Sequence, residues 1–152
     1  MTEMEKTEYQ EIIIEWGKRI PIEKAEDFKK FDIEKKKVLY QIYGDHHIYG
    51  RDTLLYIGIS TNADNRMQTH FESSVFQYVN NCSVSIGTIK KGNKDELQIP
   101  ESILIANHKP SFNKDFIHFV SEKARQDKII VINNGNNGML QTCCTNFWWV
   151  KK

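Results

Sequence analysis

Arg66 and His70 are the first residues whose types and spacing suggest chemistry. They follow an apolar segment that ends in Tyr56-Ile57-Gly58. Residues four apart share one face of a helix, so both side chains could face the same ligand. An arginine is permanently charged, and its planar guanidinium matches a phosphate group, so the pair suits a negatively charged substrate. The alternative is that both residues form the solvated flank of an ordinary helix.

Further polar groups occur before and after this pair. Tyr40 and Tyr56 fall on two apolar segments that could pair as antiparallel strands and turn both phenols to one face. Glu101 follows Pro100 near an expected helix start, where its charge suits the helix dipole. Asn113 follows a Pro-Ser-Phe turn. Taken singly, each has a structural explanation: the tyrosines as core residues, Glu101 as a helix-end charge and Asn113 as a loop brace.

Taken together and in this order, these residues resemble the GIY-YIG nuclease superfamily. The family is named for two tripeptides on adjacent strands, here Val38-Leu39-Tyr40 and Tyr56-Ile57-Gly58. An arginine and a histidine, then a glutamate, then an asparagine after a proline turn follow in family order. The segment ESILIANHKPSFN, residues 101–113, resembles the corresponding stretch of the excision-repair branch. The resemblance covers residues 38–114, and it departs from the family at Val38, where the family has a glycine.

The resemblance implies a metal-dependent endonuclease that hydrolyses DNA phosphodiester bonds. Arg66 would bind the scissile phosphate, and Glu101 would hold one Mg²⁺ (or Mn²⁺) per active site, since magnesium commonly uses one or two carboxylates. Tyr40 would accept the proton of the attacking water, assisted by Tyr56 or His70, and the division of this role between Tyr40 and His70 stays open. The implied site residues are Tyr40, Tyr56, Arg66, His70, Glu101 and Asn113.

The partners expected from the sequence follow from this reading. DNA is the expected substrate, and RNA stays open. A small chain with extensions on both sides looks like a restriction-type enzyme, and cutting at a symmetric site would suit a homodimer. The alternative is a non-catalytic nucleic-acid-binding or assembly domain with the same fold, and a formal net charge of +1 favours it modestly because DNA-binding surfaces are usually basic.

The composition also indicates the cellular location of the protein and the state of its cysteines. No apolar run approaches the length of a membrane span, and residues 1–11 show no secretory signal, so we expect a cytoplasmic protein that binds no membrane. The chain has three cysteines, and two of them are adjacent, which suits neither a disulfide framework nor a zinc site. Buried, reduced thiols are therefore expected at Cys82, Cys143 and Cys144.

The secondary structure expected from the sequence predicts an α+β fold. It has a small mixed or antiparallel three-stranded sheet flanked by helices, and these elements would position the candidate residues. Residues 38–43 and 53–59 are strand-like and enclose a polar loop with His46 and His47, which could contact substrate or be exposed to solvent. Residues 84–88 alternate between apolar and polar and predict the third strand. One helix should begin near Thr61 or Asn62, with Met67, Phe71, Val75 and Tyr78 buried. A second should cover residues 97–108 and end before Pro110.

At 152 residues the chain fits one domain with appendages on a nuclease-like core, residues 38–117. Residues 1–37 are expected to form two N-terminal helices, because apolar residues recur at helical spacing in two runs: Tyr9, Ile12, Ile13 and Trp16, then Ile22, Ala25, Phe28 and Phe31. Residues 118–152 are expected to form a short helix and a C-terminal β-hairpin packed on the core. The hairpin strands flank NNGNNG, a strong turn signal.

Overall fold

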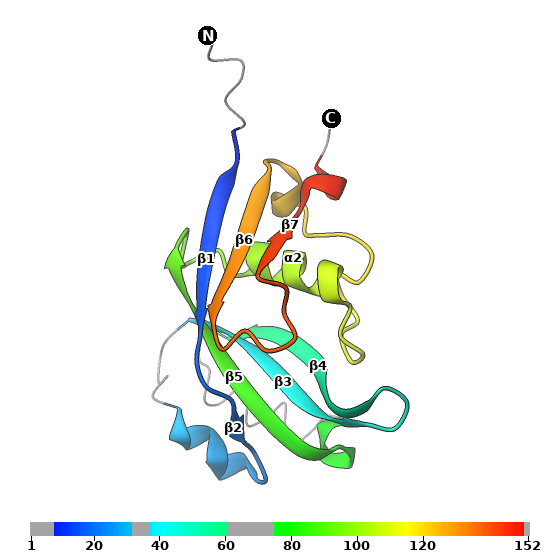
Figure 1. Ribbon diagram of the computed structural model, residues 1–152. Helices are drawn as coiled ribbons and strands as arrows, with labels where there is room; N and C mark the ends of the chain where they lie inside the picture. The colour runs from blue at the N-terminus through cyan, green and yellow to red at the C-terminus, as the bar shows by residue number, and fades with distance from the viewer. Residues whose placement is uncertain (1–7, 32–36, 61–74, 151–152) are drawn as a thin grey trace.

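The computed structural model describes residues 8–31, 37–60 and 75–150. Its dominant element is a mixed β-sheet with α2 packed on one face (Figure 1). The strands are β1 (Gln10–Trp16), β2 (Ile20–Pro21), β3 (Val38–His46), β4 (Gly50–Ser60), β5 (Asn80–Lys91), β6 (Ile129–Gly135) and β7 (Cys143–Thr145). The helices are α2 (Gln98–His108) and the 3₁₀ helices η2 (Ala25–Lys30), η3 (Val75–Tyr78), η4 (Lys123–Arg125) and η5 (Phe147–Trp149).

The predicted α+β fold with a three-stranded sheet flanked by helices is wrong. The three expected strands are present and lie side by side in the order β4-β3-β5, but the sheet continues through β1, β6 and β7, and β2 pairs with β5. Within the described ranges, α2 is the single α-helix. The sheet is large because both extensions of the chain contribute strands to it.

The N-terminal segment accounts for much of this difference. Residues 10–16 form β1, which lies between β5 and β6 and pairs with both. The side chains of Ile12, Ile14 and Trp16 are buried at alternate positions, which is the period of a strand. The run of three isoleucines, β-branched and stiff, favours this conformation once strands are available on both sides. The second predicted N-terminal helix is a six-residue 3₁₀ helix, η2.

Other local predictions have separate outcomes. The helix predicted over residues 97–108 is confirmed as α2, which ends at His108. The next residue, Lys109, caps the helix with a left-handed φ of 49° and directly precedes Pro110. β6 and β7 pair antiparallel, as predicted for the C-terminal hairpin. Tyr78, expected in a buried stripe, is exposed. The start of that first helix, with Arg66 and His70, lies outside the described residues.

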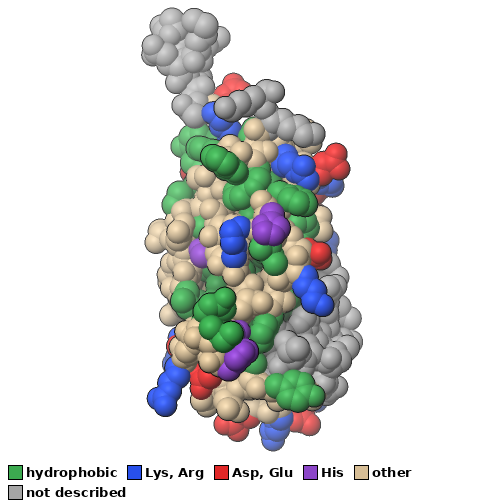
Figure 2. Space-filling model, turned by 90° about the vertical axis from the view of Figure 1, so that its right-hand side faces the viewer, with side chains coloured by type: hydrophobic (Ala, Val, Ile, Leu, Met, Phe, Trp, Pro, Cys, Tyr) green, Lys and Arg blue, Asp and Glu red, His purple; other side chains and the backbone are tan. Residues whose placement is uncertain are grey.

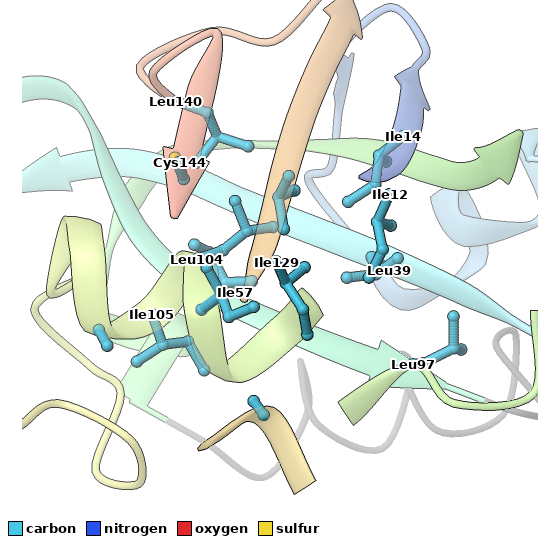
Figure 3. Close-up of a cluster of buried hydrophobic side chains, with 14 of the residues drawn as sticks. Ile12, Ile14, Leu39, Ile57, Leu97, Leu104, Ile105, Ile129, Leu140 and Cys144 are labelled. Carbon is cyan, nitrogen blue, oxygen red and sulfur yellow. The ribbon is translucent and has the colours of Figure 1, made fainter. Parts of the chain in front are cut away.

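Two apolar clusters cover the two faces of the sheet. The first lies between α2 and the sheet and includes Leu39, Ile57 and Leu104 (Figure 3). The second lies on the opposite face and includes Tyr40, Ile42 and Val84. β5 lies between β3 and β1, and its Gly87 is paired with a residue of each strand. A Cβ added at Gly87 would lie 2.7 Å from Cζ3 of Trp16. The bare backbone at Gly87 therefore lets the Trp16 ring pack across the sheet.

No helix in the described part of the chain has both the length and the apolar character needed to cross a bilayer.

Candidate functional site

Tyr40 and Tyr56 lie together on one face of the β3–β4 hairpin, which we call the tyrosine face. In the register of the two strands, Tyr40 is opposite Gly58 and Ile42 is opposite Tyr56. Residues opposite one another project to the same face, so both phenols point to one side. Their ring centroids are 6.0 Å apart. Tyr40 is 1% exposed and Tyr56 is half-buried, so Tyr56 lies nearer to solvent.

Gly58 makes the close approach of the two rings possible. A Cβ added at Gly58 would lie 2.6 Å from both Cζ and Oη of Tyr40, and 2.7 Å from Cε1 of Tyr56. Any side chain at this position would therefore displace one or both rings. Sequence reasoning included Gly58 in the second tripeptide but assigned it no role. The signal that could have found it is the pairing of a glycine opposite a large aromatic residue on the neighbouring strand.

Asn113 braces the tyrosine face from the edge of the sheet. Its Oδ1 accepts a hydrogen bond from the backbone N–H of Ile57 (3.0 Å), and its Nδ2 donates one to the Ile57 carbonyl (2.9 Å). The backbone N–H of Phe112 donates to the Leu55 carbonyl at 2.9 Å. β4 is the edge strand, so these bonds satisfy backbone groups that would otherwise lack partners within the sheet. Ile57 lies between Tyr56 and Gly58, so Asn113 fixes the segment that holds the tyrosine pair.

Glu101 lies in the first turn of α2 and is 9% exposed. α2 packs against Leu39 and Ile57, whose side chains are on the opposite face from Tyr40 and Tyr56. The structure therefore brings Tyr40, Tyr56 and Asn113 together, and it attaches Glu101 to an element on the other side of the sheet. Arg66 and His70 lie outside the described residues.

Metal-ligating side chains do not gather elsewhere in the described part of the chain: no group of three or more His, Cys, Asp or Glu residues lies close enough there to hold an ion. Glu101 is the metal ligand that the resemblance implies. One carboxylate matches the ligand set that Mg²⁺ commonly takes, since waters and substrate phosphate fill its remaining positions.

A cysteine and a histidine, Cys144 and His108, meet beside α2, with the Cys144 sulfur 3.9 Å from Nε2 of His108. His108 Nδ1 donates to the Leu104 carbonyl (2.8 Å), and Nε2 accepts from the backbone N–H of Gln141 (2.9 Å). Burial raises the pKa of the Cys144 thiol to about 12 and lowers the pKa of His108. A thiol must ionise to act as a nucleophile, and the burial of Cys144 opposes that ionisation.

Comparison with known proteins finds no protein-family model, curated protein or solved structure that matches the chain. A function for the chain has to follow from its own residues and their geometry.

Proposed function

We propose that the chain is a metal-dependent endonuclease that hydrolyses DNA phosphodiester bonds at the tyrosine face. The observation that carries this proposal is the Tyr40–Tyr56 pair, with ring centroids 6.0 Å apart, packed over Gly58 and braced by Asn113. Catalysis of phosphoryl transfer depends mainly on positioning and electrostatics, so a rigid pair of polar rings is a suitable component. The order of Tyr40, Tyr56, Arg66, His70, Glu101 and Asn113 along the chain, which resembles that of the GIY-YIG superfamily, points to the same function.

The proposed chemistry assigns the proton to a phenol. Water would attack the phosphorus and pass its proton to the Tyr40 oxygen, acting as a phenolate. The bond from phosphorus to the 3′ oxygen would break, and the 3′ oxygen would take up a proton from solvent. Tyr56, the more exposed of the two, positions the water and the substrate. Arg66, in the segment that follows β4, would bind the scissile phosphate through its guanidinium. His70 stays the alternative base.

Glu101 would hold the metal ion through its carboxylate, one Mg²⁺ or Mn²⁺ per active site. When bound, the ion would supply positive charge that stabilises the negative charge developing on the leaving oxygen. α2 packs on the face opposite the tyrosines, so the Glu101 carboxylate must reach the substrate from the end of the helix. A restriction-type role would further require a homodimer with two sites related by a two-fold axis. All three cysteines are free, and Cys82 and Cys144 are buried as predicted, but Cys143 is exposed, so the prediction is wrong for that residue. Free thiols suit the cytoplasmic location that we propose.

A non-catalytic nucleic-acid-binding domain is the second candidate, and two observations favour it. Tyr40 is 1% exposed, whereas a general base must reach water. Glu101 belongs to an element on the opposite face from the tyrosines. On this reading the tyrosine pair is part of the core, and the protein binds nucleic acid without cutting it.

Nicking of supercoiled plasmid DNA separates the two candidates. We expect nicking in Mg²⁺ that EDTA abolishes and that Glu101→Gln removes. Glu96→Gln is the matched control, because Glu96 precedes α2 and makes an exposed ion pair with Lys123 (3.2 Å), and it should cut at the wild-type rate. Nicking that persists in EDTA, or a Glu101→Gln variant as active as Glu96→Gln, would contradict the proposed metal site. Binding without any cleavage would select the second candidate.

A further inference from the structure

The tip of the β3–β4 hairpin carries three stacked rings, which we call the ring row. His46 lies in the middle, with its ring centroid 4.6 Å from that of His47 and 4.7 Å from that of Tyr49. His47 is exposed, and Tyr49 is 68% exposed. Figure 2 views the molecule from the side toward which this hairpin projects, and there histidine and hydrophobic side chains lie next to one another. The two outer rings of the row are thus open to a ligand.

Hydrogen bonds hold the ring row in place. The backbone N–H groups of Ile48 and Tyr49 donate to Nδ1 of His46, at 3.0 and 3.1 Å. The Asp45 carboxylate accepts from the backbone N–H of Asp52 (3.0 Å) and from the side chain of Asn81 (2.7 Å). Since the tip is already ordered, a ligand that stacks on it loses little of its binding energy to ordering the protein.

The ring row also continues toward the tyrosine face. The Phe112 ring lies 5.7 Å from that of His46 between centroids, and both Phe112 and Tyr56 pack against the apolar cluster that contains Tyr40. His46 and Tyr40 are six residues apart on β3, which corresponds to about 20 Å along a strand. A single strand of several nucleotides can span that distance.

We infer that the ring row binds unpaired bases of single-stranded nucleic acid. Aromatic rings are general partners for bases because every base has a flat π face, and those faces are hidden between neighbours in a duplex. Arg51, exposed beside the row, supplies a cation for the phosphate backbone. This inference rests on the proposed endonuclease only for the consequence that the bound strand is then cut, and it names an unpaired segment as part of that substrate.

Fluorescence anisotropy in EDTA tests the inference without cleavage. The probe is a labelled oligothymidylate of about twelve nucleotides, compared with an abasic oligomer of equal length and with a duplex. We expect the wild type to bind the oligothymidylate most tightly and Tyr49→Ala to weaken that binding at least about fivefold. Tyr49→Phe keeps the ring, and Ile48→Ala removes apolar surface without a ring from the same tip, so both should stay within about twofold of wild type.

The abasic oligomer identifies what is recognised. It carries the same phosphates without bases, so Tyr49→Ala should leave its binding unchanged. An equal loss for the abasic oligomer and the duplex, no effect of Tyr49→Ala, or no binding of the oligothymidylate by the wild type would overturn the inference. Tyr49-dependent binding without plasmid nicking in Mg²⁺ would retain the inference and reject the nuclease. Nicking with Tyr49-independent binding would do the reverse.

Discussion

Gly58→Ala should disturb the tyrosine face more than its size suggests. The new methyl group would lie 2.6 Å from Cζ and Oη of Tyr40, whereas ordinary van der Waals contacts begin at 3.4 Å. The Tyr40 ring would therefore have to retreat by about 0.8 Å, against the other members of a buried cluster. Overpacking of this kind costs about 1–3 kcal/mol of unfolding free energy. On the proposed function, a displacement near 1 Å also costs about a hundredfold in cleavage rate.

The matched control is Gly17→Ala. A Cβ at Gly17 would meet only the Ile86 carbonyl oxygen, at an ordinary 3.6 Å, so this variant should change stability by less than about 0.5 kcal/mol. Urea unfolding followed by circular dichroism measures both variants, and thermal melts should shift by about 3 °C per kcal/mol. The Tyr40→Ala background supplies the second control, because it removes the contact of the new methyl group with Tyr40 and leaves only the one with Cε1 of Tyr56, at 2.7 Å.

Three outcomes bear on this reasoning. In a double-mutant cycle, Gly58→Ala should cost less in the Tyr40→Ala background than in the wild type, by about 1 kcal/mol or more. An equal cost in both backgrounds would refute the clash with Tyr40 as the source of the loss. A Gly58→Ala variant as stable as Gly17→Ala would refute the close packing of the tyrosine pair itself.

Three further predictions test the surroundings of the site. Asn113→Ala should lower the unfolding free energy by about 2–3 kcal/mol in urea titrations, because it leaves the backbone N–H and C=O of Ile57 without their partner; a loss below about 0.5 kcal/mol would show that the brace is dispensable. Stability should fall as the pH drops below 6.5, the ordinary pKa of histidine. Burial lowers the pKa of His108 in the folded protein, so the unfolded chain binds the proton more readily. The His108→Gln variant should lose less stability over the same pH range, and an equal loss would assign the effect to other groups. Ellman's reagent should find one fast thiol in the native protein, exposed Cys143, since burial raises the pKa of both Cys82 and Cys144; two fast thiols would contradict the described packing.

The central strands and α2 could be predicted from sequence because their signals are local. Residues 38–43 and 53–59 are apolar runs of strand length, and residues 97–108 end at a helix-breaking proline. The structure extends the two strands into β3 and β4 and places the helix at Gln98–His108. Such patterns give the type of each element, and the true ends depend on pairing partners.

The N-terminal segment could not be assigned in this way. Its apolar residues fit a helical period through Tyr9, Ile12, Ile13 and Trp16, and they fit a strand period through Ile12, Ile14 and Trp16 equally well. The segment forms a strand because β1 pairs in parallel with β6, and Trp16 Nε1 donates a hydrogen bond to Asn133 Oδ1 at 2.9 Å. A partner so distant in the chain leaves no local trace in the sequence.

In the candidate site, too, some features could be predicted from the sequence and others depend on tertiary structure. The order of residues along the chain identified Tyr40, Tyr56 and Asn113, which the structure brings together. The position of Gly58 under both rings depends on the hairpin register, and that register contains irregularities after Ile42 and after Gly44 that no turn signal predicts. The face on which α2 packs, and with it the approach of Glu101, likewise depends on tertiary packing.

The most direct test of the central claim is the single-turnover cleavage rate of Tyr40→Phe in Mg²⁺. The change removes only the phenol oxygen and keeps the ring over Gly58, so the fold should persist, which a thermal melt checks. Tyr78→Phe is the control, because Tyr78 is 88% exposed and lies outside the tyrosine pair. If the Tyr40 oxygen accepts the water proton, Tyr40→Phe should cut about a hundred- to ten-thousandfold more slowly than Tyr78→Phe. Equal rates for the two variants would contradict the account and remove Tyr40 from the chemistry.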